Sequence, residues 1–158
     1  MTKKTITLLI SSVVIGLLVG VIFIFVQPLF GMSALTQRHA EGYMKLGSMS
    51  ESTALVSAWF VHLFISACYG IASAIALLIS RNALPYTLQI VFLGWITTVI
   101  APPANAFLVK LIGTQSLPAI STLPALNFAF DAKLVLHLIF FAVIAISLWS
   151  YQRISTQL

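Results

Sequence analysis

The sequence predicts an all-α protein, a bundle of four transmembrane helices with a partly apolar, proline-interrupted outer loop. Four long apolar runs lead to this prediction, at residues 6–26, 54–79, 85–101 and 132–151. Each is about long enough, at ~1.5 Å of rise per residue, to cross a hydrocarbon core of about 30 Å. Lys133, at the start of the fourth run, is the only Asp, Glu, Lys or Arg residue in any of them. Because lipid offers backbone groups no hydrogen-bond partner, each run should fold as a helix.

The composition agrees with a single integral membrane domain over residues 1–158. Hydrophobic residues make up 60% of the chain and charged residues 7%, whereas a soluble domain carries about 25% charged residues. The net charge of +5 does not indicate nucleic-acid binding, since the basic residues are scattered without forming a patch. We expect them to set topology and to contact anionic lipid. The expected partners are the lipid bilayer and either other membrane subunits or further copies of this chain, with no nucleic acid.

The first run, 6–26, follows two lysines, as a signal peptide would. It exceeds the apolar core of roughly 7–15 residues that a signal peptide has, and no small-residue cleavage site follows it. We therefore expect an uncleaved first helix. Gly16 and Gly20 give it the GxxxG spacing at which two membrane helices approach closely.

The segment 27–53 is the first expected outer loop. Its middle, 33–46, mixes Ala, Leu and Met with charged residues and suits a short amphipathic helix lying at the membrane interface. Ser52 and Thr53 then offer an N-cap for the second helix.

The second run, 54–79, places small residues at strict four-residue spacing. Ser66, Gly70 and Ala74 continue a line that starts at Ala58 and includes His62. Residues four apart share one helix face, so we predict that a neighbouring helix packs on this face. The chain has a single cysteine, which rules out an intrachain disulfide.

The third run begins at Pro85 and should end at Pro102 and Pro103. Two consecutive prolines remove two backbone donors and disfavour helical geometry in the residue before them. The following stretch, 104–130, is mostly apolar but is broken by one glycine and two prolines. It suits either an interfacial loop or a re-entrant cap over a site on the outer face.

The fourth run, 132–151, presents a bulkier surface that includes Phe140 and Phe141, and Trp and Tyr residues lie near several expected membrane borders. Short segments bearing Lys or Arg would lie on the inner side if both termini are inside. Basic residues in short segments set orientation most strongly. We therefore expect both termini to be cytoplasmic.

His62 and His137 are the candidate functional residues. Each lies well inside a span, at a similar expected depth and near Pro102. Burying a polar side chain in a membrane costs free energy, so such a residue is a candidate for a functional role. Three roles remain open. Each imidazole could form a hydrogen bond to a neighbouring helix. The pair could hold haem b or, with His39 or Asp131, a metal ion. The pair could also respond to pH or conduct protons.

Several motifs are absent, and their absence narrows the function classes. No span contains Asp or Glu, which disfavours an exchanger with an embedded carboxylate. No phosphate-binding glycine loop, CxxC or HExxH motif occurs. An enzyme is therefore the less favoured class.

The His-Leu-Phe-Ile-Ser sequence from His62, the Ala-Pro-Pro sequence after the third run and His137 in the fourth run resemble YagU-type bacterial inner-membrane proteins. The resemblance implies a four-span layout in the bacterial inner membrane and a link to survival at low pH. We therefore expect a non-enzymatic accessory or acid- or stress-related membrane component. The alternative is a bis-histidine haem- or metal-binding electron carrier, or a transporter of a small solute or ion.

Overall fold

The computed structural model describes residues 2–80 and 82–157, and this part of the chain is helical with no strand. The long helices are α1 (Lys3–Val26), α3 (Glu51–Ile79), α4 (Ala83–Thr114) and α5 (Ala132–Gln157). The shorter elements are η1 (Gln27–Phe30), α2 (Leu35–Gly47) and η2 (Ile120–Thr122). Four segments are long and apolar enough to cross a membrane, namely α1 together with η1, α3, α4 and most of α5. The predicted all-α fold with four spans is confirmed.

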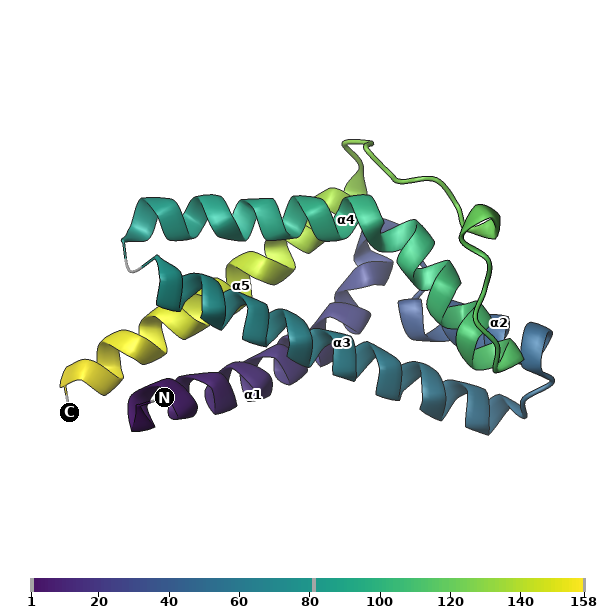
Figure 1. The fold of residues 1–158 in the computed structure, drawn as a ribbon, viewed down its shortest axis with the longest axis horizontal. Coiled ribbons are helices and arrows are strands. Elements are labelled where there is room, and N and C mark those ends of the chain that lie inside the picture. The colour runs from purple at the N-terminus through teal and green to yellow at the C-terminus, as the bar shows by residue number, and fades with distance from the viewer. Residues whose placement is uncertain (1, 81, 158) are drawn as a thin grey trace.

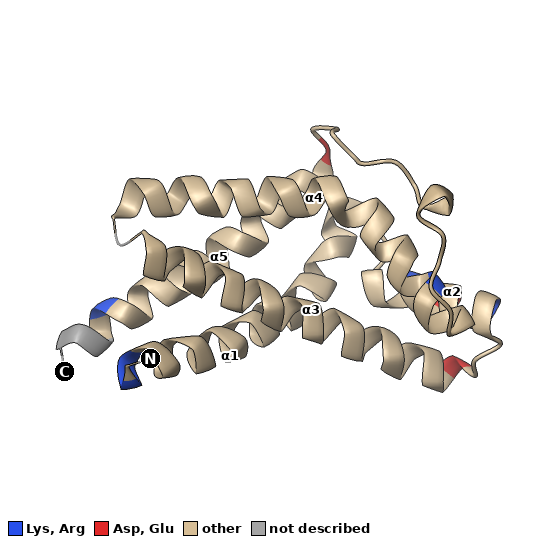
Figure 2. Ribbon diagram, viewed as in Figure 1, with Lys and Arg blue, Asp and Glu red and all other residues tan. Residues whose placement is uncertain are grey.

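The two termini and the turn between α3 and α4 lie at one end of the molecule (Figure 1). The helix α2 and the turn between α2 and α3 lie at the opposite end (Figure 1). Lys and Arg residues occur towards both ends, and the long helices between them carry few charged residues (Figure 2). This layout is the one expected when four helices run back and forth across a bilayer.

The helices α1 and α3 pack closely against each other. A Cβ atom added at Gly16 would lie 2.5 Å from the Ser66 carbonyl oxygen and 3.2 Å from the Gly70 Cα. A Cβ added at Gly70 would overlap the carbonyl oxygen of Ser12. The GxxxG segment of α1 thus packs directly on the small-residue face of α3, because only glycine lets the two backbones come this close. Farther along the same face, Ala74 is fully buried.

The helix α4 does not end at Pro102, so the expected end of the third helix there is wrong. It bends partway along (Figure 1) and continues to Thr114, with Pro102 and Pro103 inside it. A proline at 103 cannot bond the carbonyl of Val99, four residues earlier. The backbone N–H of Asn127 bonds that carbonyl instead, at 3.0 Å. The chain between α4 and α5 therefore satisfies the group that the proline leaves without a partner.

One face of the helix α2 is buried by neighbouring helices. Tyr43 is 0% exposed, and His39 and Ala40 are also buried. The helix packs against α3 and the distal half of α4, where a Cβ added at Gly47 would overlap the carbonyl oxygen of Gly113. The amphipathic segment expected at 33–46 is therefore a helix, but it forms part of the bundle.

The helix α3 begins at Glu51, three residues before its expected start at Ala54. Ser50 is the N-cap, and its side-chain oxygen accepts a hydrogen bond from the backbone N–H of Thr53 at 3.3 Å. Ser50 satisfies an amide that would otherwise have no intrahelical partner.

Candidate functional site

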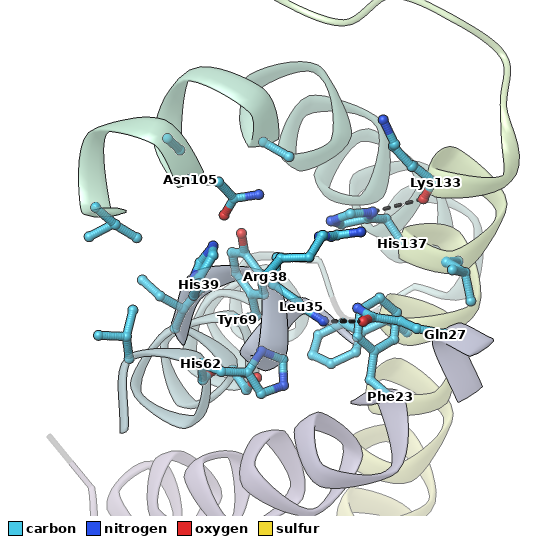
Figure 3. A pocket seen from close by; sticks show the side chains of 18 of the residues that line it. Phe23, Gln27, Leu35, Arg38, His39, His62, Tyr69, Asn105, Lys133 and His137 are labelled. Atoms are coloured by element: carbon cyan, nitrogen blue, oxygen red, sulfur yellow. Dashed lines mark hydrogen bonds between the residues drawn. The ribbon is translucent and has the colours of Figure 1, made fainter. Parts of the chain in front are cut away.

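A cavity of about 430 Å³ lies where α1, α2, α3, α4 and α5 meet, next to the bend in α4. Its volume falls in the range of roughly 300–1,000 Å³ that is usual for small-ligand sites. Apolar side chains form most of its wall. The principal polar side chains that line it are Gln27, Arg38, His39, His62, Asn105 and His137 (Figure 3).

His62 lies on α3, in the small-residue face that packs on α1. Its Nε2 is 2.9 Å from the carbonyl oxygen of Gly20. A carbonyl only accepts, so Nε2 carries the proton and donates. The side chain is 7% exposed, and its own carbonyl accepts a hydrogen bond from the Ser66 hydroxyl at 2.8 Å. This histidine therefore belongs both to a helix interface and to the cavity wall.

His137 reaches the same cavity from α5. Its Nδ1 donates to the carbonyl oxygen of Lys133, one turn earlier in the same helix, at 2.8 Å. The structure thus brings His62 and His137 to one cavity beside Pro102, as their matched depths suggest. Each ring donates to a separate backbone carbonyl, so no hydrogen bond joins the two rings.

The ring of Phe23 lies against both of these histidines. Its centroid is 6.5 Å from the His62 ring, to which it is nearly parallel, and 6.0 Å from the His137 ring. A haem held by both histidines would need a clear slot between them and a free Nε2 on His62. Phe23 lines that space, and the Nε2 of His62 is bonded to Gly20. The residues present do not fit a bis-histidine haem.

Asp131 lies outside the cavity lining and caps α5. Its Oδ1 accepts hydrogen bonds from the backbone N–H groups of Lys133 and Leu134, at 3.0 and 3.2 Å. In the part of the chain that the structure describes, no three His, Cys, Asp or Glu side chains lie where they could hold a metal ion together. The candidate metal ligands His39, His62 and His137 therefore line the cavity without forming a closed ligand set with Asp131.

His39 enters the cavity from α2, beside Asn105. It is 4% exposed, and neither ring nitrogen has a partner in good hydrogen-bond geometry, although the side chain of Asn105 lies close enough to act on the ring. Its pKa is lowered from 6.5 to about 4, mainly by burial and further by repulsion from Arg38 and His62, while the side chain of Asn105 acts to raise it. At neutral pH the ring is uncharged and presents one donor and one acceptor inside the protein.

Sequence reasoning missed two other polar residues of the cavity, Gln27 and Arg38. Arg38 was expected on an amphipathic helix at the membrane interface, and Asn105 was expected near the depth of the two histidines but in an irregular stretch. Gln27 is 4% exposed, and its side-chain oxygen accepts a hydrogen bond from the backbone N–H of Leu35 at 2.6 Å. The sequence could have placed Asn105 in the cavity wall, because Asn105 shares a helix face with Ala101, which also lines the cavity, if the helix continues past Pro102.

Comparison with protein-family models, with curated proteins and with solved structures gives no match to this chain. The fold and the cavity define its class, a multi-pass membrane protein with a partly polar internal cavity. The cavity itself is the basis for any more specific function.

Proposed function

We propose that this protein is a non-enzymatic ligand-binding component of the membrane, which takes up a small molecule in the cavity between α2 and the four spans. The observation that carries the proposal is the cavity itself, with His39, His62 and His137 converging on it from three different helices. Such a pocket, mostly apolar with a few convergent polar groups, is the usual form of a small-molecule site.

The unpartnered imidazole of His39 supports the same function. A buried polar group without a hydrogen bond costs about 1–3 kcal/mol, so proteins rarely keep one without a use. A bound ligand that hydrogen-bonds to His39 would satisfy it. The other two histidines are fixed by the backbone carbonyls of Gly20 and Lys133, so the cavity holds its rings in set orientations.

The test fills the cavity with a larger side chain. Ala101 lines the cavity on α4, and Ala101→Phe would occupy part of its volume. Native mass spectrometry of the full chain released from native membranes should detect a small molecule on the wild type that Ala101→Phe has lost. The control is Cys68→Phe, because Cys68 is exposed and does not line the cavity. Equal small-molecule content in all three proteins would contradict a binding function.

A second candidate function, a role in acid or other stress, has its own observation. Because the pKa of His39 is about 4, the ring, which lies beside Arg38, becomes charged only when the pH falls to about 4. The proposed likeness to YagU-type proteins of the bacterial inner membrane, with both termini cytoplasmic, points to the same role. Survival of a deletion strain at low pH should be restored by the wild-type gene and not by a His39→Gln gene. Equal rescue by both genes would remove this candidate.

A further inference from the structure

The charged side chains around the cavity are all positive. Arg38 from α2 and Lys133 from the first turn of α5 line it, and no carboxylate does. The chain has three Asp and Glu residues in total. Glu41 and Glu51 lie outside the lining, and Asp131 accepts its hydrogen bonds from the start of α5. Among the described residues no carboxylate forms an ion pair with Arg38 or Lys133, and Asp131, whose charge reaches His137, is the one carboxylate shown to act on a cavity residue.

The side chain of Arg38 is directed into the cavity. Figure 3 shows it extending from α2 across the space, with its guanidinium group towards His137. Partial burial lowers the pKa of Arg38, yet a guanidinium keeps its charge in proteins. A guanidinium presents a planar fork of N–H donors that matches the two oxygens of a carboxylate or a phosphate. Its position therefore suits an oxyanion.

Neutral donors surround the same space. His39 is more than nine-tenths buried, and neither ring nitrogen has a partner in good hydrogen-bond geometry. Figure 3 shows it facing the cavity beside Asn105, whose side chain acts on the ring. The Gln27 side-chain oxygen is used by Leu35, which leaves the amide N–H₂ group of Gln27 without a hydrogen bond to a described residue. An oxyanion bound at Arg38 would find further donors on α2, α4 and η1.

The rest of the wall is apolar and includes Phe23, Val61, Ile65, Leu108, Leu136 and Phe140. A purely polar anion would leave this surface uncovered, whereas a molecule with an anionic head and an apolar chain would contact both parts. Resting on the proposed binding function, we propose that the ligand is a small anionic amphiphile. Its oxyanion binds the Arg38 guanidinium, and its chain lies between α3 and α5.

The experiment uses the full chain in phosphatidylcholine nanodiscs and isothermal titration calorimetry at neutral pH. The probes are octanoate, 1-octanol and octylammonium, which share a chain and differ in the charge of the head. Octanoate should bind at least about tenfold more tightly than either of the others, as expected for a charge-assisted hydrogen bond inside a protein. Equal binding of 1-octanol, tighter binding of octylammonium, or no binding of octanoate would overturn the inference.

Variants assign the preference to Arg38. Arg38→Gln should weaken octanoate binding at least about tenfold, and Arg38→Lys should recover part of the loss because it restores the charge. The matched control is Lys45→Gln, an exposed basic residue of α2 outside the cavity, which should change affinity by less than about threefold. If Arg38→Gln does not fold, Lys133→Gln takes its place and should also weaken octanoate selectively. Unchanged octanoate affinity in the folded variant would overturn the inference.

Two further arms identify the source of the anion and separate this inference from the proposed function. Weaker octanoate binding in nanodiscs that contain phosphatidylglycerol would indicate a lipid head group, and competition by inorganic phosphate would indicate a free anion. Both results support oxyanion binding. If Ala101→Phe abolishes binding of octanoate and 1-octanol alike while the wild type does not distinguish them, ligand binding stands and anion recognition fails. If Ala101→Phe changes neither, the proposed function fails as well.

Discussion

His62 on α3 donates a hydrogen bond from Nε2 to the backbone carbonyl oxygen of Gly20 on α1, at 2.9 Å. This bond joins the two helices close to the point where Gly16 and Gly70 bring their backbones into contact. The same imidazole forms part of the cavity wall. The shape of the cavity is therefore coupled to how closely α1 and α3 pack, and a change in the helix interface should be felt in the site.

The first prediction concerns this interface. Gly70→Leu should lower the midpoint of thermal unfolding in detergent far more than Ile71→Leu, because any side chain at Gly70 would meet the carbonyl oxygen of Ser12. Overpacking of this kind costs about 1–3 kcal/mol or more, whereas Ile71→Leu conserves volume at a half-buried position. Equal midpoints would show that α1 and α3 separate without cost.

The second prediction concerns the bend in α4. Asn127→Pro removes the backbone N–H that bonds the Val99 carbonyl, and leaving that acceptor unpaired should destabilise the protein by about 1–3 kcal/mol. Asn127→Ala is the control, since it keeps the N–H and loses only the side-chain bonds to Ala129 and Asp131. Hydrogen exchange of the amides around the bend should quicken in the proline variant alone. Equal exchange in the two variants would count against the proposed role of the bond.

Val99 and Asn127 also explain where prediction from sequence succeeded and where it stopped. The four apolar runs and the small-residue face of α3 are visible because length, hydropathy and spacing are local properties. The continuation of α4 past Pro102 depends on a donor supplied by a residue 28 positions after Val99. No pattern near the prolines could reveal that partner, so the rule that consecutive prolines end a helix gave the wrong boundary.

The candidate site shows the same limit. His62 and His137 could be selected because an imidazole within a span is conspicuous. Arg38 and His39 lie on an amphipathic segment, and its sequence pattern looks the same whether the apolar face meets lipid or other helices. Only the packing of α2 against α3 and α4 places these two residues in the cavity.

The third prediction concerns topology. A single cysteine at Ser48 and one at Asn82 should react with an impermeant thiol reagent from opposite sides of the membrane. Both positions are exposed, and the α2–α3 and α3–α4 turns to which they belong lie at opposite ends of the bundle (Figure 1). The background carries Cys68→Ala, which removes the native thiol. In the proposed orientation Ser48→Cys reacts from outside in intact cells and Asn82→Cys only after permeabilisation. Reaction of both from one side would contradict four spans.

The last prediction concerns pH and His39. Its pKa is about 4 in the folded protein and 6.5 in an unfolded chain, so the unfolded state binds more protons between those values. The free energy of unfolding should therefore fall as the pH drops from about 6.5 to about 4, with a loss from this residue of about 3 kcal/mol. The stabilising contribution of neutral His39 is fully present above about pH 6.5.

The measurement compares wild type with His39→Gln, whose side chain stays neutral throughout this range. Unfolding free energies in mixed detergent should show a steeper acid loss for the wild type, and the difference between the two proteins should change by about 3 kcal/mol between pH 7 and pH 4. Arg38 lies beside His39 on α2 and repels its protonated form. The Arg38→Gln variant should therefore lose less unfolding free energy in acid than the wild type does. Parallel pH profiles for wild type and His39→Gln would mean that the pKa of His39 is the same in the folded and unfolded states. The ring would then be open to water, which would contradict its burial.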